Sequence, residues 1–168
     1  MKEFRISLLV VAVALLVSAI ALPAATASGS VKPKPKTVVL TGTYSGTASS
    51  KVDGNNATLS ATGKGSLSKI GAGGITGAGV ADASQQPCPP FGGTGTITGA
   101  KGTIAFSVAS GSKGCGDDGG HLFTLVGYFH VTKATGSLAK AKGQLRFTGT
   151  YDRDAGTFQI KVSGSLKQ

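Results

Sequence analysis

The sequence predicts an all-β domain, and three features of its composition support this. All 27 glycines lie after residue 28 without a Gly-X-Y period, and glycine at that density disfavours helix and excludes collagen. Threonine, serine and valine, which are common in strands, fill much of the space between the glycines. Glutamate, a frequent residue of surface helices, occurs only at Glu3. We therefore expect a single antiparallel domain over residues 37–168.

The first 27 residues have the pattern of an export signal. A short basic start precedes an apolar run from Ile6 to Leu22, and Pro23 ends that run. The small residues of Ala25-Thr26-Ala27 then match the preference of signal peptidase. We expect residues 1–27 to be a cleaved signal peptide and the protein to be secreted or held at the cell envelope. An uncleaved anchor is the alternative, because the run is nearly long enough to span a bilayer.

Residues 28–36 form a predicted linker that ends in Lys32-Pro-Lys-Pro-Lys36. Alternating prolines favour an extended path, and the segment is either a spacer or a cationic tether. The formal net charge of the whole chain is +10. This charge fits an anionic cell-envelope surface as a partner, with simple solubilisation as the alternative. Nucleic acid is not expected, because the lysines are scattered and the aromatic residues fall at inward strand positions.

The strands are predicted from alternation with period two. In the first, Val38, Leu40, Gly42 and Tyr44 share one face. The glycine-rich segment Gly71–Gly79 is either a weak strand or an ordered loop. Further on, residues 94–99 and 103–109 form a hairpin around Lys101.

The clearest hairpin is at the C-terminal end of the chain. Leu145, Phe147, Gly149 and Tyr151 share one face before a turn at residues 152–156, and Phe158, Ile160, Val162 and Leu166 share one face after it. Such a hairpin has one dry and one wet face. The number of predicted strands is about eight, which favours an eight-stranded up-and-down β-barrel, with a β-sandwich as the alternative.

The segment His121–Val131 is apolar on both of its faces. Phe123 and Phe129 share one face, and Leu122, Val126 and Tyr128 share the other. Because successive side chains alternate across a strand, we expect Leu122, Val126 and Tyr128 to face outward and to be covered in an oligomer. The histidines at positions 121 and 130 are expected to be structural, with a general base in the cavity as the alternative.

The two cysteines are predicted to form a Cys88–Cys115 disulfide, because export places an isolated pair in an oxidising compartment. Both lie in sequence contexts typical of loops, Pro87-Cys-Pro-Pro90 and Gly114-Cys-Gly116, so the bridge should join two loops at one end of the barrel. A metal site that includes His121 is the alternative. The acidic segment from Asp117 to His121 lacks calcium-loop spacing and is expected to be a solvated turn, so no metal ligands are assigned.

Residues 134–166 resemble the C-terminal half of bacterial barrels of the allene oxide cyclase and dirigent-like superfamily. The resemblance rests on Gly136-Ser-Leu138, Phe147-Thr-Gly-Thr150 and Gly156-Thr-Phe158. It implies an eight-stranded barrel with an apolar central cavity, no metal or organic cofactor, and often a homotrimer. Cyclases of this kind rely on a buried glutamate, which residues 28–168 lack, so no catalytic residue is transferred from the family.

The expected function is the non-enzymatic binding of a small apolar ligand, or service as an envelope-associated module. The candidate cavity-lining residues are the aromatic residues at inward positions: Tyr44, Phe106, Phe123, Phe129, Phe147, Tyr151 and Phe158. A cofactor-free cyclase or isomerase that uses the same cavity is one alternative, and a β-sandwich that binds a cell-surface polymer is another. No serine lies in a nucleophile elbow, and no pair of carboxylates suits glycoside hydrolysis.

Overall fold

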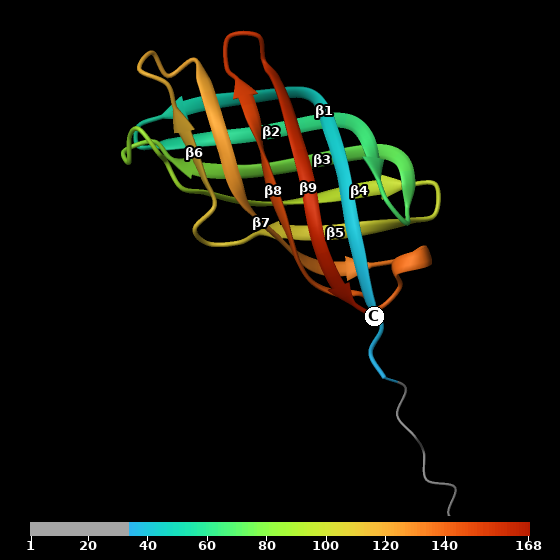
Figure 1. Ribbon diagram of the computed structural model, residues 1–168. Coiled ribbons are helices and arrows are strands. Elements are labelled where there is room, and N and C mark those ends of the chain that lie inside the picture. Colours follow the sequence, from blue (N-terminus) through green and yellow to red (C-terminus); the bar gives the residue numbers. More distant parts are fainter. Residues whose placement is uncertain (1–33) are drawn as a thin grey trace, which may run out of the picture. The chain divides into compact units, whose positions relative to one another are not determined.

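The computed structural model describes residues 34–168, which form a closed antiparallel β-barrel (Figure 1). The predicted fold class is thereby confirmed, and the β-sandwich alternative is excluded. The predicted signal peptide and most of the predicted linker lie outside the described residues. The strands are β1 (Thr37–Asp53), β2 (Asn56–Leu67), β3 (Gly71–Asp82), β4 (Phe91–Gly99), β5 (Gly102–Val108), β6 (Lys113–Gly116), β7 (Leu122–Ala134), β8 (Lys142–Asp152) and β9 (Thr157–Lys167).

The barrel closes because each strand position has two hydrogen-bonded neighbours. Strands β1 to β5 pair in chain order, β9 pairs with both β1 and β8, and β7 pairs with β8 and β5. The long strand β1 belongs to both sides of the barrel. Residues 37–47 pair with β9 and residues 42–53 pair with β2, so β1 bends from one layer into the other (Figure 1). No long unpaired sheet edge remains among these strands.

Nine strands occupy eight positions around the barrel, because β5 and β6 lie one after the other at the same position beside β7. Strand β7 pairs with β5 along its second half and with β6 along residues 123–126. Between β5 and β6 the ladder is bridged by the buried Ser112. Its Oγ accepts a hydrogen bond from the Tyr128 amide at 3.2 Å and donates one to the Ala109 carbonyl at 2.8 Å. A Cβ at Gly127 would overlap Ser112, so only glycine fits beneath this bridge.

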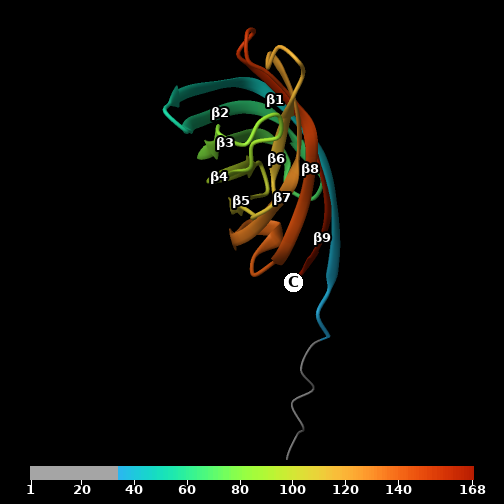
Figure 2. The same ribbon diagram turned by 90° about the vertical axis from the view of Figure 1, so that its left-hand side faces the viewer.

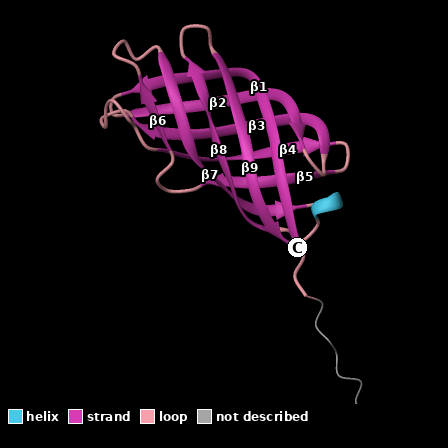
Figure 3. Ribbon diagram, in the orientation of Figure 1, coloured by secondary structure: helices cyan, strands magenta, loops and turns pink. Residues whose placement is uncertain are grey.

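One end of the barrel is filled by aliphatic side chains. We call this the closed end, and it consists of the loops at residues 68–70, 100–101 and 135–141 together with the strand ends that they join. The last loop contains a single 3-10 turn, η1 (Gly136–Leu138), which is cyan in Figure 3. Its Leu138 is 1% exposed and belongs to the core. The side chains that fill this end are almost fully buried: Leu40, Leu67, Ile70, Ile97, Ile104, Leu138, Leu145, Val162 and Leu166.

The opposite end carries the loops at residues 54–55, 83–90, 117–121 and 153–156, and we call it the open end. In Figure 2 the β6–β7 and β8–β9 loops of this end lie at the top of the view, and the β1–β2 hairpin lies at its left. The glycine-rich segment with the uncertain prediction is the regular strand β3, paired with β2 along its whole length. Both predicted hairpins are present, as β4–β5 and β8–β9.

Candidate functional site

The open half of the barrel encloses a cavity of about 230 Å³. Its two walls differ in side-chain size. One wall, on strands β1 to β3, is built of small residues: Ala48, Ala57, Ala61, Gly77, Gly79 and Ala81. The other wall, on β5 and β7 to β9, is built of aromatic residues: Phe106, Phe123, Phe129, Phe147, Tyr151 and Phe158. The hollow exists because the small wall leaves the space between them unfilled.

The aromatic wall is preorganised by contacts between its own rings. Phe129 stacks on Phe106 at 4.1 Å and on Phe147 at 4.5 Å between ring centroids. Phe123 and Tyr151 form a further stacked pair at 6.0 Å near the mouth. Such packed rings hold their positions without a ligand, so the cavity is largely pre-formed.

Few polar groups line the cavity, and four of them lie towards the mouth. The Tyr151 hydroxyl donates to Ser50 Oγ at 3.2 Å, and the side chain of Gln86 belongs to the loop that borders the opening. The guanidinium carbon of Arg153 lies 6.0 Å from the centre of the Phe123 ring. Among residues 34–168, the ion pair that forms is His121 with Asp154, so Arg153 has no carboxylate partner there.

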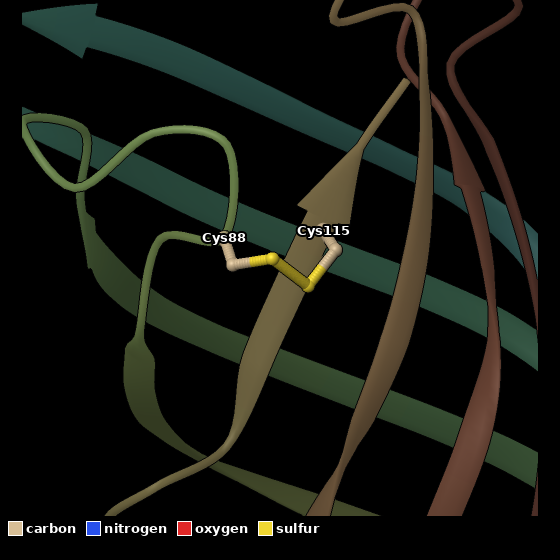
Figure 4. Close-up of a disulfide and its surroundings, with 2 residues drawn as sticks. All are labelled: Cys88 and Cys115. Atoms are coloured by element: carbon tan, nitrogen blue, oxygen red, sulfur yellow. A yellow bond between two sulfur atoms is a disulfide. The ribbon is translucent and has the colours of Figure 1, made fainter. Parts of the chain in front are cut away.

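A disulfide shapes the mouth of the cavity. Cys88, in the loop at residues 83–90, is bonded to Cys115 of β6 with an S–S distance of 2.15 Å (Figure 4). The amides of Gly114 and Gly116 donate to the carbonyls of Pro89 and Pro87 at 3.1 and 2.9 Å, so this loop also satisfies the free edge of β6. The sequence predicted the pairing but placed Cys115 in a loop. That placement was wrong, because a four-residue strand with two glycines has no visible alternation.

Tyr44 differs from the other six candidate lining residues, because the structure does not place it on the cavity wall. Its side chain is 1% exposed, and its hydroxyl has no hydrogen-bond partner among residues 34–168. Burial raises the pKa of Tyr44 to about 12. The inward alternation of β1 correctly indicates burial, but it cannot tell how far along the barrel axis the cavity extends.

Replacing Tyr44 with phenylalanine should raise the free energy of unfolding by about 1 kcal/mol, because it removes a buried hydroxyl without a partner. The matched control is Tyr151→Phe. It removes a hydroxyl that has a hydrogen-bond partner, Ser50 Oγ, so it should lower the free energy of unfolding. Chemical denaturation measures both.

The raised pKa of Tyr44 also makes the native state lose stability between pH 10 and about 12, since only the unfolded chain ionises readily there. Tyr44→Phe should lack this contribution, and equal destabilisation by both variants would contradict the assignment.

The rim of the open end is acidic. All six aspartates of residues 34–168 lie in its loops or at the strand ends beside them: Asp53, Asp82, Asp117, Asp118, Asp152 and Asp154. Hydrogen bonds from the side chains of Ser84 and Gln85 lower the pKa of Asp82. A hydrogen bond from the His121 amide lowers the pKa of Asp117. These carboxylates therefore stay charged at mildly acidic pH.

Both histidines lie outside the cavity. His130 is exposed on the outer face of β7, and the exposed His121 pairs with Asp154 at 2.7 Å between Nδ1 and Oδ2. A histidine base in the cavity, an alternative considered from the sequence, is therefore excluded. Within residues 34–168 there is no group of three or more metal-ligating side chains. In the same region no helix is long and apolar enough to cross a membrane.

The three candidate interface residues lie on the outer face of β7. Leu122 and Tyr128 are each 46% exposed, and Val126 is half-buried opposite Lys113 of β6. The alternation predicted for this strand therefore matches the structure. Self-association through these residues, and a homotrimer in particular, stays a prediction.

The small-residue wall is the part of the site that sequence reasoning missed. Its signal was the excess of glycine and alanine at inward positions of residues 57–81, which a search for alternating large apolar side chains does not reveal. No family model, curated protein or solved structure matches this chain. The resemblance of residues 134–166 to the allene oxide cyclase and dirigent-like barrels therefore stays a prediction.

Proposed function

We propose that this barrel binds one small, uncharged and mostly apolar ligand in the open half of its interior. The observation that supports this proposal is the cavity of about 230 Å³ between the small wall and the aromatic wall. An apolar cavity of roughly 150 Å³ holds benzene, and drug-sized ligands need about 300 Å³ or more. The expected ligand therefore lies between these sizes, with roughly ten heavy atoms.

Two features of the site favour an uncharged ligand over a carboxylate. The cavity walls offer few groups that could compensate a buried charge, and desolvation of an unpaired charge is costly. The acidic rim also repels anions, which the single guanidinium of Arg153 offsets only in part. Tyr151, Ser50 and Gln86 can instead hydrogen-bond a hydroxyl or carbonyl of the ligand at the mouth. Catalysis is not part of the proposal, because neither histidine nor any aspartate side chain lines the cavity.

The decisive variant is Gly77→Leu, which fills the cavity from the small wall. A Cβ built at Gly77 lies 3.5 Å from its nearest neighbour, the Thr94 carbonyl oxygen, so a side chain fits there without displacing the backbone. Wild-type protein should bind naphthalene with a Kd on the order of 100 μM or tighter, measured by fluorescence titration. Gly77→Leu should weaken this binding at least tenfold while leaving the melting temperature equal or higher, since it replaces empty space with packed atoms.

The matched control is Ala72→Leu, which adds a leucine to the exposed face of the same strand. It should leave naphthalene binding unchanged. In a charge series, naphthylmethanol should bind more tightly than naphthoate. Native mass spectrometry of the exported protein would identify the natural ligand. Unchanged naphthalene affinity in Gly77→Leu would refute the cavity as the binding site.

A further inference from the structure

The charges of the barrel are sorted along its axis. The open end carries every aspartate of the described residues, whereas the closed end carries lysine. Nine exposed lysines lie in the closed-end loops or within three residues of a strand end there: Lys34, Lys36, Lys64, Lys69, Lys101, Lys133, Lys140, Lys142 and Lys167. No aspartate or glutamate side chain lies at this end within residues 34–168. A charge separation of this kind orients a molecule in the field of a charged surface.

Two of these lysines occupy backbone conformations that lysine rarely adopts. Lys69 has φ +77° and Lys140 has φ +67°, and they are the two non-glycine residues with positive φ in the part of the chain that the structure describes. Glycine or asparagine fits such turns with less strain. Neither lysine forms an ion pair within residues 34–168, so no internal contact of their charged groups explains them. Strained positions held by residues without an internal role point to an external one.

An exposed apolar side chain accompanies the lysines. Val39, on the outer face of β1, is 64% exposed, the largest value among the exposed large apolar side chains of the described residues. It lies next to the closed end, where Thr37 pairs with Lys167. Lysines around an apolar side chain suit the boundary of a bilayer, where headgroups attract the ammonium groups and the acyl region accepts the valine. An acidic polysaccharide would satisfy the lysines but would leave Val39 in water.

We propose that the closed end docks on an anionic phospholipid surface, with the open mouth directed away from the bilayer. The preceding chain joins the barrel at this same end, because Lys36 pairs with Gln168 beside the start of β1. The acidic rim is repelled by the same surface, so one orientation is favoured. Docking at the closed end leaves the cavity accessible, and it does not depend on the cavity's having a ligand.

The test uses the exported protein with vesicles of phosphatidylcholine alone or mixed with phosphatidylglycerol. We expect cosedimentation with the mixed vesicles only, and its loss at high salt. The variant Lys69→Gln/Lys101→Gln/Lys140→Gln/Lys142→Gln should lower the partition coefficient by roughly five-hundredfold, because each lysine near such a surface contributes about fivefold. The added substitution Val39→Ser should lower the partition coefficient further, although it leaves the net charge unchanged.

The matched control is Lys51→Gln/Lys113→Gln/Arg146→Gln/Lys161→Gln, which removes the same charge from exposed positions on the sides and near the open end. It should retain binding within a few-fold. Hydrogen exchange of the wild type on vesicles should show new protection at residues 68–70 and 135–141 and none at residues 117–121. Equal losses in the two quadruple variants would overturn the proposal, as would protection at the open end. Binding to soluble acidic polysaccharide without binding to the mixed vesicles would overturn it too.

Discussion

Replacing Cys88 and Cys115 with serine should lower the free energy of unfolding by about 3–4 kcal/mol. The disulfide closes a loop across a sequence separation of 27, and the entropy lost by the unfolded chain on closing a loop of that size accounts for the amount. For a domain of this length the melting temperature should fall by roughly 10–15 °C. The β-sheet circular dichroism spectrum at low temperature should persist, because the ladders that close the barrel do not depend on the bridge.

Calorimetry of the double variant beside wild type, in oxidising and in reducing buffer, checks this prediction. Reduction should affect the wild type alone and bring it close to the variant. The hydrogen bonds between β6 and the loop from Pro87 to Pro90 should also open more often, so the amide hydrogens of Gly114 and Gly116 should exchange faster with solvent. A double variant as stable as the oxidised wild type would contradict this prediction, because the disulfide would then add no stability to that supplied by the hydrogen bonds.

Replacing Phe147 with alanine should lower the free energy of unfolding by about 3 kcal/mol. Its ring is 2% exposed and contacts the rings of Phe129 and Phe91 at 4.5 and 6.0 Å between centroids. Loss of a buried phenylalanine costs about 3–5 kcal/mol, and the lower value applies here because one side of the ring already borders a cavity. The variant should also enlarge that cavity, so that anthracene gains affinity relative to naphthalene.

The matched control for Phe147→Ala is Tyr128→Ala, which removes a half-exposed aromatic ring from the outer face of the neighbouring strand. It should cost less than about 1 kcal/mol. Chemical denaturation gives the stabilities, and fluorescence titration gives the ligand preference. If the two variants were equally destabilised, the aromatic wall would not be the packed element that the ring contacts indicate.

Much of the fold could be predicted because alternation with period two is a local signal. The hairpin from Lys142 to Lys167 shows it most clearly, since every inward position of its two strands is aromatic, aliphatic or glycine. The sequence does not decide between strand and loop for one element and wrongly indicates a loop for another, both for the same physical reason. The strand Gly71–Asp82 has glycine or alanine at most positions, and Lys113–Gly116 has two glycines in four, so neither displays two distinct faces. Their strand character comes from neighbours that pair with them.

The aromatic lining of the candidate site could be predicted from the sequence, but the size of the cavity could not. Inward aromatic positions such as Phe123 and Phe158 follow from alternation alone, whereas the depth of the cavity depends on which residues face them across the barrel. That opposing wall comes from strands far away in the sequence. The sorting of charge between the two ends escaped for a related reason. Lysines that are scattered along the chain gather only when antiparallel strands bring every second turn to the same end.

The glycines that line the cavity limit how this barrel could evolve a new ligand preference. At Gly79 and Gly93 a Cβ would collide with the backbone of the neighbouring strand, so substitution there would require rebuilding the sheet. Gly77 has open space before it and tolerates larger side chains. Ligand selectivity could therefore change by substitution at very few positions. The aliphatic packing of the closed end, which lies outside the cavity, would maintain the fold. Homologues with different ligands should differ at the position of Gly77 before they differ at those of Gly79 and Gly93.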